Sequence, residues 1–121
     1  MINFFKKLFK ISPMRQKILK IKKDLKLVVK SHCKENFWID WYGAYEFLPN
    51  APESLMFWIC VKTDKEKMIL LSNQKLESEF REILKMNSYS VEAVMLVGFG
   101  VESQETVNRE YDGDWYLYFK S

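Results

Sequence analysis

The last third of the chain, residues 94–119, constrains the fold more than any other stretch. It combines the richest apolar material of the chain with its densest set of charged side chains. Residues 94–102 form an apolar run and residues 114–119 form an aromatic run, and both runs are typical of strands. Asp112-Gly113-Asp114 between them has the composition of a solvated turn. We therefore expect two strands joined by a polar loop.

The size and composition of the chain indicate one folded domain. Its 121 residues, of which 48% are hydrophobic, suffice for a core without a structural metal or a disulfide. Cys33 and Cys60 lack CxxC spacing, which favours free buried thiols in a reducing cytoplasm. We expect a basic amphipathic arm over residues 1–12 and a single cytoplasmic α+β domain over residues 13–121, with no cofactor and no metal.

Charge is distributed very unevenly along the chain. Residues 1–34 carry eleven Lys or Arg against Asp24 alone, a net charge of +10. Residues 35–121 carry eight basic and fifteen acidic residues, a net charge of −7. Two explanations stay open: the basic region meets an anionic partner, or its charges answer the acidic body of the same or a neighbouring subunit.

The first 34 residues predict two amphipathic segments. In residues 1–11, Phe and Leu alternate with Lys, so this segment either touches an anionic membrane surface weakly or packs on the domain or on a second copy. Ser12-Pro13 is a helix start, and the helix extends from 13 to 34. Its apolar stripe consists of Met14, Ile18, Ile21, Leu25 and Val28. The stripe continues to His32, which indicates a half-buried structural histidine rather than a catalyst.

The middle of the chain predicts a hairpin and two helices. Residues 37–47 and 55–62 alternate as strands, separated by a turn that contains two prolines. Helical spacing then predicts a short helix over 64–71 and a longer one over 74–87, with a strand over 67–71 as an alternative. The expected core-facing set is Phe37, Ile39, Trp41, Tyr45, Phe47, Leu55, Phe57, Ile59 and Val61. The expected outer set is Trp38, Asp40, Tyr42, Ala44, Glu46, Met56, Trp58, Cys60 and Lys62.

These elements predict an α+β two-layer sandwich in the order α-β-β-α-β-β. The expected sheet is antiparallel, with about four strands and with helices on one face. Its outer face would carry aromatic side chains, which in soluble proteins mark a partner, a ligand groove or a dimer interface. The alternative is that the N-terminal segment or a bend of the sheet covers these rings. The aromatic face includes Trp38, Tyr42, Trp58, Tyr116 and Tyr118.

The sequence contains no nucleophile motif, phosphate loop or spaced Cys/His cluster. Gly98-Phe99-Gly100 lacks the third glycine of a dinucleotide turn, so its expected role is to let the strand bend or a neighbouring element approach closely. The acidic body repels phosphates, which argues against nucleic acid as a partner. The main polar candidates are Glu102, Glu105, Glu110, Asp112 and Asp114, together with Arg109 and Tyr111.

Those carboxylates allow three interpretations. They are a structural loop, an acid/base or cation site, or an acidic loop that docks a basic partner with Arg109 bridging carboxylates at its base. We favour a non-enzymatic protein-binding module in which Glu102, Glu105, Arg109, Tyr111, Asp112 and Asp114 meet another protein. The hot-spot aromatics would be Trp38, Tyr42 and Trp58.

Two alternatives to that module remain. One is a small hydrolase or ligand-binding domain with its site around the 102–114 loop and His32. The other is a homodimer formed through the aromatic face.

The run from Val97 to Phe119, VGFGVESQETVNREYDGDWYLYF, resembles the ending of a family of small uncharacterised bacterial proteins. The resemblance covers about a fifth of the chain and implies no activity. A short intracellular α+β domain with an acidic body is also similar in type to immunity proteins that neutralise toxic nucleases or other antibacterial effectors. That likeness implies a protein partner and assigns no site residues.

Overall fold

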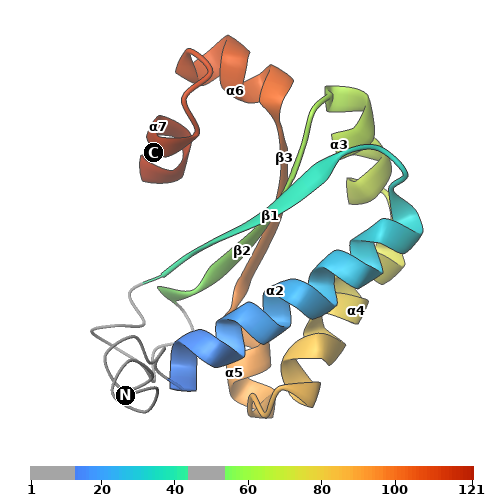
Figure 1. Ribbon diagram of the computed structural model, residues 1–121, viewed down its shortest axis with the longest axis vertical. Coiled ribbons are helices and arrows are strands. Elements are labelled where there is room, and N and C mark those ends of the chain that lie inside the picture. Colours follow the sequence, from blue (N-terminus) through green and yellow to red (C-terminus); the bar gives the residue numbers. More distant parts are fainter. Residues whose placement is uncertain (1–12, 44–53) are drawn as a thin grey trace, which may run out of the picture.

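A computed structural model describes residues 13–43 and 54–121 (Figure 1). The predicted arm over residues 1–12 and the predicted strand positions 44–47 lie outside the described residues. The elements in chain order are α2 (Pro13–His32), β1 (Phe37–Tyr42), β2 (Met56–Val61), α3 (Asp64–Leu71), α4 (Gln74–Met86), α5 (Val91–Leu96), β3 (Gly98–Ser103), α6 (Gln104–Tyr111) and α7 (Trp115–Lys120).

Among the described residues, the sheet has three strands in the order β1-β2-β3 and is mixed. The β1–β2 pair is the predicted antiparallel hairpin, with Ile39 opposite Ile59. β2 and β3 are parallel, with Ile59 opposite Val101. The chain reaches β3 through α3, α4 and α5, because parallel neighbours need a long crossover connection. The α+β class is confirmed, whereas the expected antiparallel sheet of about four strands is wrong.

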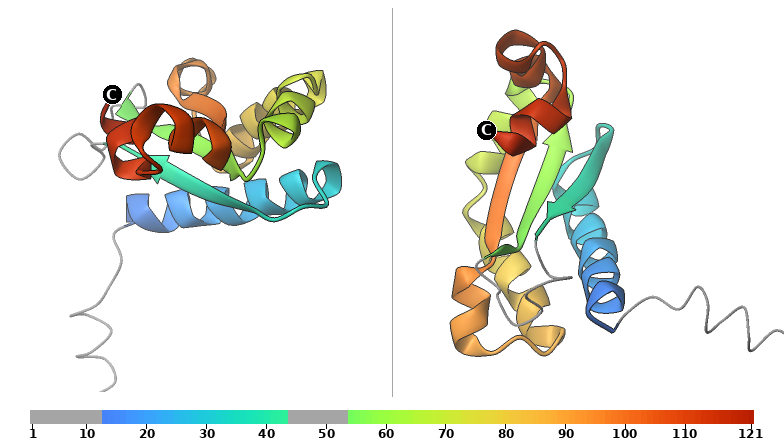
Figure 2. Two further views of the ribbon diagram at one scale, coloured as in Figure 1. Left: turned by 90° about the horizontal axis from the view of Figure 1, so that it is seen from above. Right: turned by 90° about the vertical axis from the view of Figure 1, so that its left-hand side faces the viewer.

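Helices cover both faces of the sheet. α2 and α4 lie against one face, and α6 and α7 lie on the opposite side (Figures 1 and 2). The two-layer sandwich with helices on one face is therefore a second expectation that the structure corrects. The physical reason is that β2 is apolar or aromatic on both sides and β1 carries Trp38 and Tyr42 on its second side, so each side needs a cover.

One face of the sheet carries the main core. The predicted core positions Phe57, Ile59 and Val61 on β2 are fully buried. Phe57 packs on Phe80 of α4 with ring centroids 5.6 Å apart, and Phe80 stacks on Phe99 of β3 at 4.7 Å. The core between the sheet and α4 is thus built around three phenylalanines from β2, α4 and β3.

α2 contributes a stripe of fully buried side chains to the same core. The expected stripe is confirmed at Ile18, Ile21 and Leu25, but it continues to Val29 rather than to Val28, which is only partly buried. A spacing of four from Leu25 keeps the stripe in line because three residues fall short of a full helical turn. The predicted helices over 64–71 and 74–87 are present as α3 and α4, and the strand alternative over 67–71 is wrong.

The end of the chain differs most from the sequence expectation. The predicted strand over 94–102 is divided between α5 and β3, and the predicted strand over 114–119 is α7. Asp114 caps α7, since its Oδ1 accepts hydrogen bonds from the backbone N–H groups of Tyr116 and Leu117 at 2.9 and 3.4 Å. Asp112, with φ of 53°, ends α6 in the left-handed conformation. The Asp-Gly-Asp turn therefore joins two helices rather than two strands.

Candidate functional site

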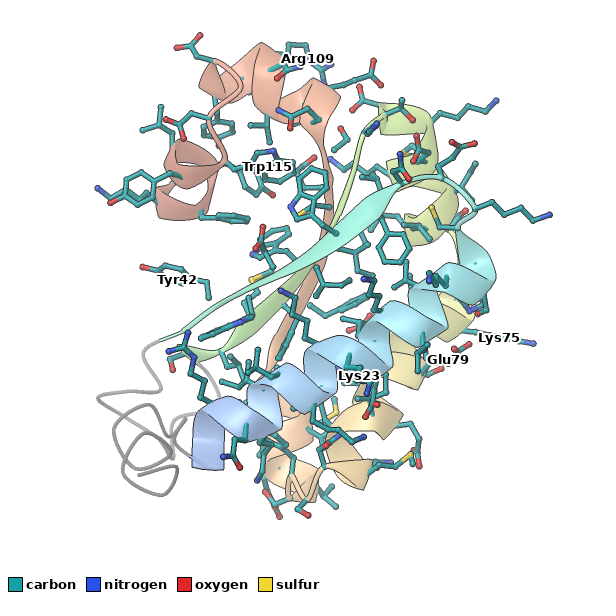
Figure 3. All side chains as sticks on the ribbon, in the orientation of Figure 1. Lys23, Tyr42, Lys75, Glu79, Arg109 and Trp115 are labelled. Carbon is teal, nitrogen blue, oxygen red and sulfur yellow. The ribbon has the colours of Figure 1, made fainter. Side chains whose placement is uncertain are left out.

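α7 lies over the aromatic face of the sheet. Trp115 of α7 meets Trp38 of β1 edge to face, with centroids 5.1 Å apart. Tyr118 and Phe119 lie 5.3 and 6.0 Å from Trp58 of β2. Figure 3 shows Trp115 between α7 and the sheet. Trp38 and Trp58 are consequently half-buried, and the element that covers them is α7, which the sequence predicts as a strand of the same sheet.

Two glycines of β3 allow the aromatic side chains of β2 to lie across the sheet. A Cβ at Gly100 would lie 2.5 Å from Cζ3 of Trp58, and a Cβ at Gly98 would lie 2.9 Å from Cγ of Met56. Any side chain at position 100 would displace the Trp58 ring. The Gly-Phe-Gly sequence thus serves close approach, as expected, and helps to place Trp58 under α7.

An open groove of about 350 Å³ lies where α6 and α7 meet the ends of β1 and β2. Tyr42 is 61% exposed at its edge, and Tyr111 contacts Tyr118 at 5.2 Å within it. Figure 3 shows Tyr42 at the end of β1. We call this feature the aromatic groove; it is lined mainly by Tyr42, Met56, Trp58, Tyr111, Tyr118 and Phe119.

Glu102 of β3 is buried beneath α7 and is fully engaged. Its Oε1 is 2.7 Å from Nζ of Lys67, and its Oε2 accepts a hydrogen bond from the Tyr118 hydroxyl at 2.8 Å. The backbone N–H of Ser103 donates to Oε1 at 2.9 Å. Burial raises the pKa of the Glu102 carboxyl, but these three partners outweigh burial and hold that pKa below its ordinary value.

The same surroundings that lower the pKa of Glu102 raise the pKa values of Tyr118 and Cys60. Burial, followed by the hydrogen bond to Glu102, raises the pKa of the Tyr118 hydroxyl. Burial also raises the pKa of the Cys60 thiol, and the nearby carboxylates of Asp40 and Glu102 add to that effect. Cys60 is therefore an inert thiol, and the Glu102 carboxylate holds α7 on the sheet through Tyr118.

A second polar cluster joins the beginnings of α3 and α6. Asp64 accepts hydrogen bonds from the hydroxyls of Ser103 and Thr106 at 2.5 and 2.8 Å. Arg109 Nη1 lies 3.1 Å from the other oxygen of Asp64. In return, Glu105 Oε1 accepts the backbone N–H of Asp64 at 2.7 Å. Each helix therefore receives a carboxylate from the other at its N-terminus, where the helix dipole favours negative charge.

Because of this cluster, the free energy of unfolding should decrease as the pH becomes acidic. The hydroxyls of Ser103 and Thr106, then Arg109, lower the pKa of Asp64 to about 2. A lowered pKa in the folded state stabilises the protein above the unfolded pKa of about 3.9, and that contribution disappears as pH falls toward 2. We expect Asp64→Asn to lose less stability than the parent between about pH 5 and pH 2.

Urea unfolding at several pH values measures that difference directly. The control is Asp112→Asn, which removes one exposed carboxylate outside this cluster. Equal pH dependence in the parent and in Asp64→Asn would contradict the assigned role of Asp64.

The predicted site residues, from the 102–114 loop and from the aromatic face, fall into three groups. Glu102, Glu105 and Arg109 belong to the two polar clusters. Trp38 and Trp58 lie under α7. The remaining predicted residues lie at the aromatic groove or on the turn beside it; they are Tyr42, Tyr111, Asp112 and Asp114.

His32 contacts residues of the α3–α4 region and not the acidic residues of the 102–114 loop. Its Nδ1 lies 2.9 Å from the Asn73 side chain and its Nε2 lies 3.2 Å from Glu79, at the end of α2. α2 lies along the core side of the sheet, whereas α6 follows the end of β3 (Figure 1). A site that combines His32 with Glu102, Glu105 and Arg109 is therefore not assembled, and the expectation of a structural histidine is in keeping with these contacts.

Sequence reasoning missed Lys67 and Asp64. The signal available for Asp64 was Ser103-x-x-Thr106, a capping spacing that leaves hydroxyls at a helix start for an acceptor from elsewhere. No such local signal marks Lys67, because its partner Glu102 is 35 positions away.

Three further findings bear on function. In the part of the chain that the structure describes, no group of three or more His, Cys, Asp or Glu side chains could hold a metal ion. Within residues 13–43 and 54–121, no helix combines the length and apolar character that crossing a bilayer requires. No family model, curated protein or solved structure matches the chain.

Proposed function

We propose that this protein is a non-enzymatic protein-binding module that docks a basic partner on the aromatic groove. The observation that carries the proposal is the exposed aromatic groove with carboxylates beside it. Tyrosine and tryptophan provide large contact areas at low entropic cost and dominate binding hot spots. Glu110, Asp112 and Asp114 lie on and beside the turn that follows Tyr111 and precedes α7, and all three are exposed.

The charge around the groove favours a basic partner. None of the ion pairs among the described residues includes Glu110, Asp112 or Asp114. Their charges are available to steer a Lys- or Arg-rich protein surface toward the groove. Because Asp114 caps α7 and Asp112 ends α6 in the left-handed conformation, Glu110 is the carboxylate whose loss affects a partner rather than the fold.

The polar clusters near the groove support binding rather than catalysis. Glu102 and Asp64 are each engaged by three or more partners, and Arg109 is engaged by Asp64 and Thr106. A catalytic acid or base needs access to a substrate proton, and these contacts leave Glu102 buried. A second hollow among the described residues, of about 380 Å³ beside β3, has one titratable side chain in its lining, Glu77, which pairs with Arg81.

An immunity-like role is one form of this proposal. A cytoplasmic domain that neutralises a basic toxic effector needs a rigid acidic and aromatic surface but no chemistry of its own. The two free buried cysteines, Cys33 and Cys60, support a reducing compartment. The competing occupant of the groove is a second copy of the chain.

Affinity capture from host lysate tests the proposal. The tagged parent is compared with Tyr42→Ala/Glu110→Lys, and the matched control is Met95→Ala/Glu92→Lys, which makes the same kinds of change on exposed α5. We expect one basic protein in stoichiometric amount, and an approximately tenfold or greater loss of its affinity for the groove variant only. Melting temperatures of all three proteins should agree within error.

Two outcomes would contradict the proposal. One is capture that the groove variant and the control variant reduce equally. The other is recovery of the protein itself alone, with a dimer that the groove variant dissociates.

A further inference from the structure

The side of α2 that faces away from the core is basic over its whole length. Its lysines recur at spacings of three and four, so they share one side of the helix, opposite Ile18, Ile21 and Leu25. Lys23 lies at the middle of this side (Figure 3). We call it the basic ridge; its exposed residues are Leu19, Lys20, Lys23, Lys26, Leu27 and Lys30.

The acidic body of the chain does not neutralise the basic ridge. Among the described residues, the one ion pair of a ridge lysine is Lys20 with Asp24, four positions along α2. The carboxylates of the adjacent α4 have other partners: Glu79 contacts His32, Glu77 contacts Arg81 and Glu82 contacts Lys85. The described residues therefore give no support to the explanation in which the lysines of this helix are neutralised by acidic residues in the body of their own subunit.

The apolar residues of the ridge indicate which anionic partner it fits. Leu27 is 63% exposed and Leu19 is 39% exposed, both among lysines. Aliphatic side chains beside lysines are typical of helices that lie in a lipid headgroup region. A nucleic-acid surface would instead favour arginine, and Arg15 is the one arginine of α2. The stacking aromatics that single strands require lie on the opposite side of the sheet, under α7.

The sequence just before α2 has the same chemistry. Residues 1–11 contain Phe4, Phe5, Leu8, Phe9 and Ile11 together with Lys6, Lys7 and Lys10. Stable attachment to a bilayer usually needs two signals, and a polybasic patch beside apolar anchors supplies both.

We infer that the basic ridge of α2 binds the anionic lipid surface of a membrane. Lys23, Lys26 and Lys30 supply the attraction to phosphatidylserine-like headgroups, and Leu19 and Leu27 enter the interface. This function is separate from the protein-binding groove, which lies on the other side of the sheet.

Vesicle co-sedimentation of the full-length protein tests the inference. Vesicles of phosphatidylcholine alone are compared with vesicles that also contain phosphatidylserine. We expect binding to the anionic vesicles only, weakening as salt is raised. In Lys23→Glu/Lys26→Glu/Lys30→Glu the partition coefficient should fall by about 100-fold or more, since each lysine near such a surface contributes about a factor of five.

The control variant is Lys62→Glu/Lys65→Glu/Lys120→Glu, which changes net charge equally at exposed positions away from α2. It should retain most of the binding of the parent, and circular dichroism should show that both variants are folded. If the ridge variant is misfolded, the salt dependence of vesicle binding by the parent protein is the test, and binding that does not weaken as salt is raised would overturn the inference. Equal loss in both variants, equal binding to neutral vesicles, or binding of the parent to an RNA or DNA oligonucleotide without binding to anionic vesicles would overturn the inference.

Discussion

Replacement of Phe57 by alanine is expected to reduce the free energy of unfolding by about 3–5 kcal/mol. Phe57 is fully buried on the central strand β2 and packs against Phe80, which in turn stacks on Phe99. Alanine would leave a cavity between α4 and the sheet, and α4 cannot collapse into it without moving Phe80. Since domains of this size have about 5–15 kcal/mol of stability, the variant should be close to unfolding at room temperature.

Urea unfolding followed by circular dichroism measures this loss. Phe57→Leu keeps most of the buried volume and should cost less than about 1.5 kcal/mol. Tyr42→Ala, which truncates an exposed ring on neighbouring β1, should stay within about 0.5 kcal/mol of the parent. A loss below about 1 kcal/mol for Phe57→Ala would mean that α4 does not pack on β2 as described.

The elements that the sequence predicts well are those fixed by local chemistry. Thr63 accepts the backbone N–H of Glu66 and Asn73 accepts that of Lys75, so the polar residues before α3 and α4 cap these helices, as such residues usually do. The alternation in β1 and β2 identifies Ile39, Phe57 and Ile59 as core residues because one side of the hairpin meets a continuous apolar layer. These features need no knowledge of distant contacts.

The secondary structure of the C-terminal third cannot be predicted from local sequence patterns in the same way, because its segments are short and apolar on several sides. α5 and α7 have six residues each, too few for a period of 3.6 to be distinguished from alternation. Asp114 decides the state of α7 by capping it, yet the same residue also suits a turn before a strand. Parallel pairing of β3 with β2 depends on the crossover through α4, which no local pattern specifies.

The candidate site is predictable in composition but not in arrangement. The sequence identifies Glu102, Glu105 and Arg109 as a charged group, and the structure places them in two separate clusters. Glu102 lies on β3, which ends at Ser103, whereas Glu105 and Arg109 lie on α6, which begins at Gln104. The change from strand to helix therefore directs Glu102 to a different part of the structure from Glu105 and Arg109. Burial of Glu102 requires Lys67 and Tyr118, and neither residue is near it in the sequence.

The two proposed surfaces lie on opposite sides of the sheet. α2 carries the basic ridge on one side, while α6 and α7 form the aromatic groove on the other (Figure 2). Attachment of the ridge to an anionic bilayer would leave the groove and its carboxylates directed away from the lipid. Repulsion between those carboxylates and the bilayer would favour the same orientation. Lipid binding and partner binding therefore need not compete, and each set of variants should leave the other activity intact.

Removal of the Glu102 carboxylate is the second change with a large expected effect. Glu102→Ala leaves the Lys67 ammonium without its anion and the Tyr118 hydroxyl without its acceptor. Breaking a buried pair costs about 3–5 kcal/mol, and we expect about 3 kcal/mol here because the Lys67 side chain keeps 23% of its exposure. The cost should shrink as pH falls below the ordinary pKa of a glutamate, because the Glu102 pKa is lowered in the folded protein.

A double-mutant cycle with Lys67 separates the pair from the rest of the site. Glu102→Leu/Lys67→Met replaces both charges by apolar groups and should be clearly more stable than Glu102→Leu alone, because no uncompensated charge remains. Tyr118→Phe removes one hydrogen bond to the carboxylate and should cost about 1–3 kcal/mol, since a charged acceptor is involved. Additive losses in the cycle would show that Glu102 and Lys67 do not interact, and α7 would then be held on the sheet by its aromatic contacts alone.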